Sequence, residues 1–79
     1  MYQTTILLRD IDHVKRFVEM TSRYDKLKIN LISDIYTIDA HSIIGIVSLD
    51  INRPIVLEVP EEMPPAEFIE DVKQFAEER

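Results

Sequence analysis

The side chains able to do chemistry lie in two short stretches of the 79-residue chain. Asp10, Asp12 and His13 stand together near the N-terminus, and His41 and Ser42 are adjacent in the middle. An imidazole can act as a nucleophile, a proton carrier or a metal ligand, and a serine hydroxyl can accept a phosphoryl group. The two histidines are far apart, and neither has an acid at metal-ligand spacing. We therefore expect no metal site and no catalytic residue.

Composition excludes several other chemistries. A single glycine leaves no room for a Gly-rich phosphate loop or a nucleophile elbow, and the absence of cysteine removes thiolate ligands and thiol nucleophiles. The net charge of −6 repels nucleic acid and anionic lipid. No apolar run approaches the roughly 20 residues of a membrane span. We expect a cytoplasmic protein that is not an enzyme, holds no cofactor, and binds neither nucleic acid nor membrane.

The elements that must position these residues follow from the apolar periodicity. Alternation predicts four strands, over residues 2–8, 27–31, 36–40 and 55–59. A 3.6-residue period predicts two amphipathic helices, whose apolar faces run from Val14 to Tyr24 and from Ile69 to Ala76. Asp10 or Asp12 is placed to cap the first helix, and Ser42 to cap a short helix over residues 43–49. The order β-α-β-β-α-β-α in one domain, residues 1–79, predicts an α+β sandwich with an antiparallel sheet.

Two stretches resemble the HPr family, the phosphocarriers of the bacterial sugar phosphotransferase system (PTS). Ser42-Ile43-Ile44-Gly45-Ile46-Val47-Ser48-Leu49 resembles, nearly residue for residue, the segment around the family's regulatory serine. Ser22-Arg23-Tyr24-Asp25 followed by Ile29-Asn30-Leu31 resembles the end of its first helix and its second strand. His41 departs from the family, which usually has lysine or another polar residue there. The resemblance implies an HPr-like two-layer open-faced sandwich, with sheet order 1-4-2-3 and three helices on one face.

The family's phosphocarrier motif is degenerate in this chain. In the family a histidine caps the first helix and is followed by a neutral residue, an arginine and a proline. Alignment of the buried helix face places Asp10 at the histidine position, Asp12 at the arginine position and His13 at the proline position. Two carboxylates would oppose a phosphoryl dianion at a cost on the order of 1 kcal/mol each. We therefore expect no competent phosphocarrier, with a divergent carrier that uses His13 as the alternative.

The short helix after Ser42 is the predicted functional surface. It holds more apolar side chains than one short helix can bury, and three of them match positions through which HPr proteins bind their partners. Two basic residues of the first helix are expected at the rim of this surface, where they would attract an acidic partner. The predicted protein-binding residues are Ile43, Ile44, Val47, Lys15 and Arg16. The resemblance also implies regulatory phosphorylation of Ser42, which the helix dipole favours.

Two classes of function therefore stand side by side. The first is a regulatory protein-docking module in the control of sugar transport, a monomer or weak homodimer bound by a regulator, a kinase or a phosphotransferase component. The second is a small-molecule-binding module of ferredoxin-like type. The second class requires a well-formed apolar pocket between the sheet and the helices.

Overall fold

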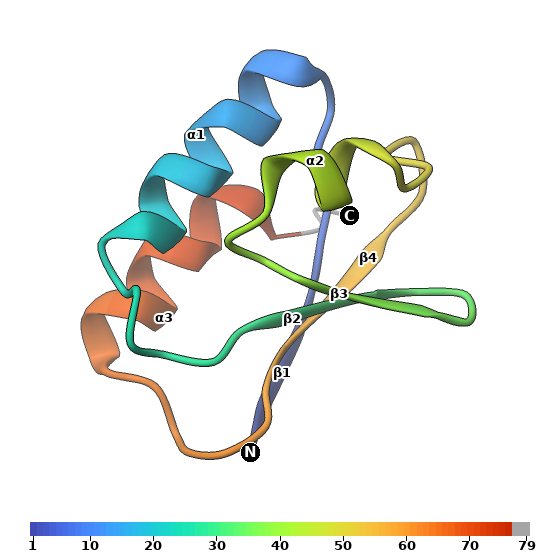
Figure 1. Cartoon of the computed structure of the whole chain (residues 1–79). Helices are drawn as coiled ribbons and strands as arrows, with labels where there is room; N and C mark the ends of the chain where they lie inside the picture. The colour runs from blue at the N-terminus through green and yellow to red at the C-terminus, as the bar shows by residue number, and fades with distance from the viewer. Residues whose placement is uncertain (77–79) are drawn as a thin grey trace.

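A computed structural model describes residues 1–76 of the chain. Within these residues the elements follow in the order β1 (Tyr2–Ile6), α1 (Ile11–Ser22), β2 (Asn30–Ser33), β3 (Tyr36–Asp39), α2 (Ile43–Val47), β4 (Ile55–Val59), α3 (Ala66–Val72) and a 3₁₀ turn, η1 (Lys73–Phe75). The described strands form one antiparallel sheet in the order β1-β4-β2-β3, and the helices cover one of its faces (Figure 1). The predicted fold class, element order and strand order are confirmed.

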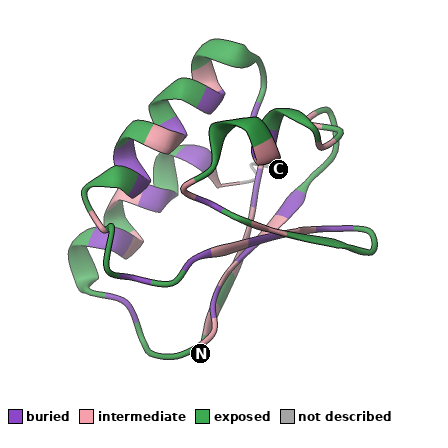
Figure 2. Cartoon of the chain, in the orientation of Figure 1, coloured by how far each residue is buried: buried purple, intermediate pink, exposed green. Residues whose placement is uncertain are grey.

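The core lies between the sheet and the helices. Alternate strand residues face inward, and Leu31 of β2 stands opposite Leu57 of β4 with both side chains fully buried. The rings of Phe17, Phe68 and Phe75 are the largest buried side chains and fill the space beneath α1 and α3. Figure 2 shows these inner faces as buried and the outer helix faces as exposed. Within residues 1–76 no helix has both the length and the hydropathy needed to cross a bilayer.

The last turn of the chain returns to the first strand. The backbone N–H of Leu7 donates to the carbonyl of Phe75 over 2.8 Å, and Ile6 forms a β-bridge with Ala76. The Phe75 ring packs edge-on against Phe17, with ring centroids 5.2 Å apart. The end of β1 is thus tied to η1 through backbone and side chains.

Several element boundaries differ from the predictions, and three of them have a clear local cause. Leu27 belongs to the turns after α1, where its N–H donates to the Tyr24 carbonyl, so β2 begins at Asn30. The hairpin turns on Asp34 and Ile35, and Asp34 has a φ of 53° that aspartate tolerates better than most residues. The short second helix ends at Val47, because the Ser48 hydroxyl donates to the Gly45 carbonyl and caps the end.

Candidate functional site

The N-terminus of α1 is capped by a carboxylate of the chain itself. Asp10 has extended backbone geometry, and its Oδ1 accepts a 2.8 Å hydrogen bond from the backbone N–H of His13. The Asp10 carbonyl accepts the N–H of Val14, which begins the helical ladder. An anion is stabilised at this position by the free amides and the helix dipole. Of the two predicted caps, Asp10 fills the role, and its negative charge lies at the free amides of this helix end.

His13 lies in the first turn of α1 and uses one ring nitrogen inside the protein. Its Nδ1 accepts a 3.1 Å hydrogen bond from the backbone N–H of Arg9. A neutral imidazole that accepts a hydrogen bond at Nδ1 carries its proton on Nε2. The ring's one free lone pair is therefore on Nδ1, where the Arg9 N–H already binds it. The ring also packs against Phe75, with centroids 4.9 Å apart. The nitrogen able to attack a phosphoryl group is therefore already bonded to the backbone.

Basic and acidic groups mix around this helix end. Arg9 and Arg16 line one hollow together with Asp10, Asp12, His13 and Gln74. Lys15 lies about 200° around the helix from His13, on the opposite side of α1. Arg16 and Lys15 are both exposed, and their place at the rim of the docking surface stays a prediction.

The helix α2 presents the predicted docking residues to solvent. Ile43 is 38% exposed, Ile44 79% and Val47 44%, while Ile46 is fully buried. Ser42 caps the helix, and its Oγ accepts the backbone N–H of Gly45 over 3.1 Å. The predicted cap is confirmed, and the three aliphatic side chains form an exposed group that we call the α2 patch.

The segment before α2 is tied to the rest of the fold by two side chains. The Thr21 hydroxyl of α1 lies 3.1 Å from the buried carbonyl of Ala40. His41 Nε2 lies 3.1 Å from the Leu27 carbonyl, and its backbone N–H donates to Asp39 Oδ1. His41 thus has a structural partner. Within residues 1–76 no cluster of three His, Cys, Asp or Glu side chains is placed to hold a metal ion.

A polar contact between the turn that follows α1 and α3 was not predicted from the sequence. The Tyr24 hydroxyl donates a 2.7 Å hydrogen bond to Asp71 Oδ2, and Arg23 pairs with the same oxygen at 3.5 Å. The hydrogen bond to Asp71, assisted by desolvation, raises the pKa of Tyr24 to about 12. Tyr24 and Arg23 belong to different predicted faces of their helix, and an aspartate 47 residues away carries no local signal.

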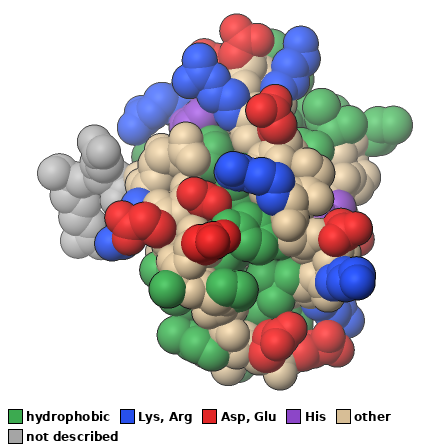
Figure 3. Space-filling model, turned by 90° about the vertical axis from the view of Figure 1, so that its left-hand side faces the viewer, with side chains coloured by type: hydrophobic (Ala, Val, Ile, Leu, Met, Phe, Trp, Pro, Cys, Tyr) green, Lys and Arg blue, Asp and Glu red, His purple; other side chains and the backbone are tan. Residues whose placement is uncertain are grey.

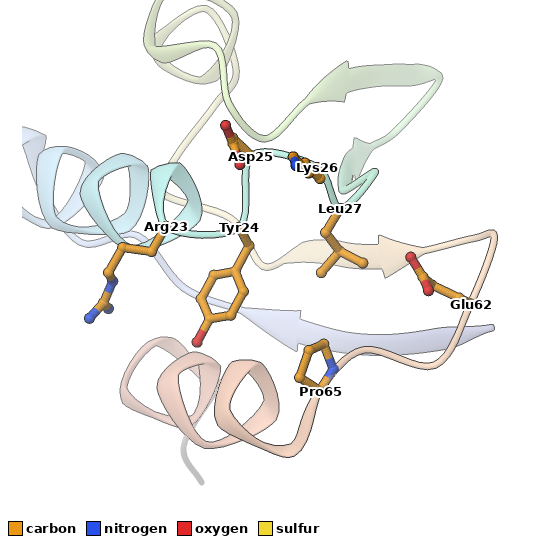
Figure 4. Close-up of a pocket in the computed structure, with 7 residues that line it drawn as sticks. All are labelled: Arg23, Tyr24, Asp25, Lys26, Leu27, Glu62 and Pro65. Atoms are coloured by element: carbon orange, nitrogen blue, oxygen red, sulfur yellow. The ribbon is translucent and has the colours of Figure 1, made fainter.

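This contact borders a shallow hollow. Its walls are Arg23, Tyr24, Asp25, Lys26, Leu27, Glu62 and Pro65. Figure 4 shows the Tyr24 ring directed toward α3, with Leu27 and Pro65 on either side of the opening. On the corresponding face of the molecule, hydrophobic side chains gather between acidic and basic groups (Figure 3). The hollow is open to solvent and lies outside the space between sheet and helices.

Other exposed apolar residues were also missed. Ile35 at the hairpin tip is 89% exposed and the adjacent Tyr36 62%, and Ile11 at the start of α1 is 51% exposed. The alternation in the sequence assigned Tyr36 to a strand correctly, but it did not reveal that this strand lies at the edge of the sheet.

Comparison with known proteins supports the architecture. A scan against protein-family models gives no match, and a search of curated proteins gives none either. Among solved structures, the chain is similar to HPr-C-His from Thermoanaerobacter tengcongensis. The two share 23% sequence identity and a TM-score of 0.75, over 94% of this chain and 89% of that chain. With its β1-β4-β2-β3 sheet and its helices on one face, the protein therefore has the HPr fold.

Proposed function

We propose that this HPr-fold protein is a regulatory docking module of the phosphotransferase system type, which does not carry phosphoryl groups itself. One observation carries the proposal. The Asp10 carboxylate holds the amide of His13 at the start of α1, while the lone pair of His13 is bonded to Arg9. A phosphohistidine needs a free lone pair and free amides nearby, and both are occupied here.

The α2 patch is the proposed docking surface. Ile43, Ile44 and Val47 are aliphatic, exposed and held on a helix that Ile46 anchors in the core. Clusters of this kind exclude water from the centre of protein interfaces. Lys15 and Arg16, both exposed on α1, are the proposed basic rim of this surface. The partner is a protein: a regulator, a kinase or a phosphotransferase component in the bacterial cytoplasm.

Phosphorylation of Ser42 is proposed to control this surface. The Oγ atom that a kinase would modify is the cap of α2 and lies on an exposed residue. A phosphate there would add about two negative charges next to Ile43 and Ile44. The change alters the surface that a partner meets while leaving an acceptor for the Gly45 amide.

Phosphoryl transfer tests the loss of carrier function. The protein is incubated with phosphoenolpyruvate and enzyme I, with an active HPr as the positive control. We expect no acid-labile phosphate on the wild-type protein. A label that is present on the wild type and disappears in His13→Ala would identify a divergent carrier and overturn the proposal.

Partner capture tests the docking surface. Wild-type protein, Ile44→Glu and the control Met63→Glu are compared as baits in extract from the source cells. Met63 is exposed to a similar degree, 65%, and lies in the loop before α3. We expect Ile44→Glu to lose the captured partner and Met63→Glu to keep it. Equal capture by both variants would remove the α2 patch from the mechanism.

No observation in residues 1–76 favours the small-molecule-binding module. The three phenylalanine rings occupy the space between sheet and helices that such a module would leave open.

A further inference from the structure

The outer edge of β3 is a second candidate surface, separate from the α2 patch. β3 is the last strand of the sheet and pairs on one side, with β2. Tyr36 and Thr37 are exposed, and no proline interrupts the strand. In Figure 1 the β2–β3 hairpin projects beyond the rest of the sheet. An uncovered edge of this kind can pair with another extended chain.

The register shows which backbone groups face outward. The turn of the hairpin comprises two residues, so the pair next to it, Ser33 and Tyr36, is the hydrogen-bonded kind. The bonded pairs alternate along the ladder, which assigns the N–H and C=O of Ile38 to β2 and those of Thr37 to the free edge. Within residues 1–76, Tyr36–Ile38 make no backbone hydrogen bond to a loop or cap. Thr37 therefore offers both a donor and an acceptor to a new strand.

An apolar groove lies beside this edge on the helix side of the sheet. Tyr36, Ile38, Ser48 and Leu49 line it, and its volume is about 300 Å³. Side chains of a strand alternate between faces, so every second residue of an added strand would point to the same side as Tyr36 and Ile38. The groove can accept one of those side chains, provided that it is apolar.

The charges around the edge select the partner. Asp34 at the hairpin tip and Asp50 after α2 both approach Arg53, at 3.9 and 3.5 Å, and Asp39 ends the strand. Two carboxylates therefore approach one guanidinium, which leaves the hairpin end of this edge with a net negative charge. A second copy of this chain brings the same carboxylates and a net charge of −6, so self-pairing is disfavoured. A segment that carries lysine or arginine is favoured.

We propose that the β3 edge binds an extended, basic segment of a partner protein by strand addition, with an apolar side chain of that segment in the groove beside Tyr36 and Leu49. The pairing uses the free backbone groups of Thr37. The acidic residues around the hairpin attract the lysine or arginine side chains that alternate with the apolar ones.

The probe is a nine-residue peptide of alternating valine and lysine, with blocked termini, titrated into ¹⁵N-labelled protein. We expect the amide signals of Thr37, Ile38 and Leu49 to shift and the exchange of the Thr37 amide to slow. Two further peptides carry backbone N-methyl groups on alternate residues, in one peptide on the even positions and in the other on the odd. Strand addition requires one of these peptides to bind and the other to fail, because only one edge of the peptide meets β3.

Variants of the protein test the backbone pairing at Thr37 and the attraction by the acidic residues separately. Thr37→Pro removes an outward N–H that is not part of the β2 ladder, which an edge strand tolerates. We expect it to weaken binding about tenfold or more. Asp34→Asn combined with Asp50→Asn should weaken binding roughly threefold. The matched control, Glu61→Gln combined with Glu62→Gln, changes the charge equally in the distant loop before α3 and should bind as the wild type does.

Four results would overturn the proposal. They are equal binding of both N-methylated peptides, signal shifts confined to residues 43–47 and abolished by Ile44→Glu, dimer formation through β3 without peptide, and no binding at about 1 mM peptide. The second of these would leave the α2 patch intact as a docking surface. Conversely, loss of capture by Ile44→Glu with unchanged peptide binding would support both surfaces independently.

Discussion

Replacing Tyr24 by phenylalanine removes one hydroxyl from the contact between α1 and α3 and leaves the ring in place. The hydroxyl donates to Asp71 over 2.7 Å, and the ring packs edge-on against Phe68 with centroids 5.1 Å apart. The substitution therefore isolates the hydrogen bond from the packing. Asp71 keeps its ion pair with Arg23 in the variant.

The size of the effect follows from the exposure of the contact. A hydrogen bond to a charged group contributes roughly 1.5–3 kcal/mol when well buried. The Asp71 side chain is 31% exposed, so solvent screens the hydrogen bond. We therefore expect the bond to contribute about 1 kcal/mol to the free energy of unfolding. For a domain of this size, that loss lowers the Tm by about 4–8 °C.

The same bond makes stability depend on pH at the alkaline end. Asp71, first by its hydrogen bond and then with desolvation, raises the pKa of Tyr24 from 10.0 to about 12. A raised pKa means that the unfolded chain loses this proton first. The contribution of Tyr24 is therefore complete below pH 10 and is lost as the pH rises through 12. The wild-type advantage over Tyr24→Phe should shrink across this window.

Urea unfolding at pH 8 and at pH 11.5 measures the free energy of unfolding of wild type and of Tyr24→Phe. The difference between the two proteins at each pH cancels the contribution of the lysines, which titrate in both. Tyr36→Phe is the matched control, because Tyr36 is 62% exposed and makes no such bond among the described side chains. We expect a loss of about 1 kcal/mol for Tyr24→Phe at pH 8 and almost none for the control. Equal stability of the two variants at pH 8, or a difference that does not change with pH, would refute the reasoning.

Five further substitutions, in three tests, probe the site by thermal unfolding. Asp10→Ala should cost about 1 kcal/mol through loss of the α1 cap, and Asp10→Asn much less; equal costs would show that charge rather than the hydrogen bond matters. Ile46→Ala should cost about 2–4 kcal/mol and Ile44→Ala almost nothing, because one side chain is buried and the other 79% exposed; comparable losses would contradict the orientation of α2. Thr21→Val should cost about 1–2 kcal/mol by leaving the buried Ala40 carbonyl without its partner; an unchanged Tm would show that this bond is dispensable.

Periodicity was sufficient to predict the strands, the helices and the fold class. The alternation of apolar and polar residues around Leu31 and Leu57 indicates an inner and an outer face of the sheet. The 3.6-residue period of α1 indicates the helix face that packs against the core. These signals are local and strong, because burial decides each position separately. The strand order came from the resemblance to HPr rather than from the periodicity.

The site was predictable to a smaller degree. Local rules predicted the Ser42 cap and narrowed the first cap to Asp10 or Asp12, and the resemblance to HPr pointed to Ile44 as an exposed residue. The hydrogen bond from Arg9 to His13 Nδ1 could not be predicted, because it depends on the path of the chain between β1 and α1. The resemblance to HPr placed the third strand at an edge, but the outward direction of the Thr37 backbone groups depends on the register with β2, which the sequence did not predict.

The bond between Leu7 and Phe75 has a consequence for biosynthesis. β1 is synthesised well before Phe75, which lies near the end of the described residues. Contacts of such long sequence separation form late and slowly. The bond between Leu7 and Phe75 can form only after Phe75 has left the ribosomal exit tunnel. We expect the hydrophobic side chains of β1 to remain uncovered until then, and cellular chaperones to meet this segment in the interval.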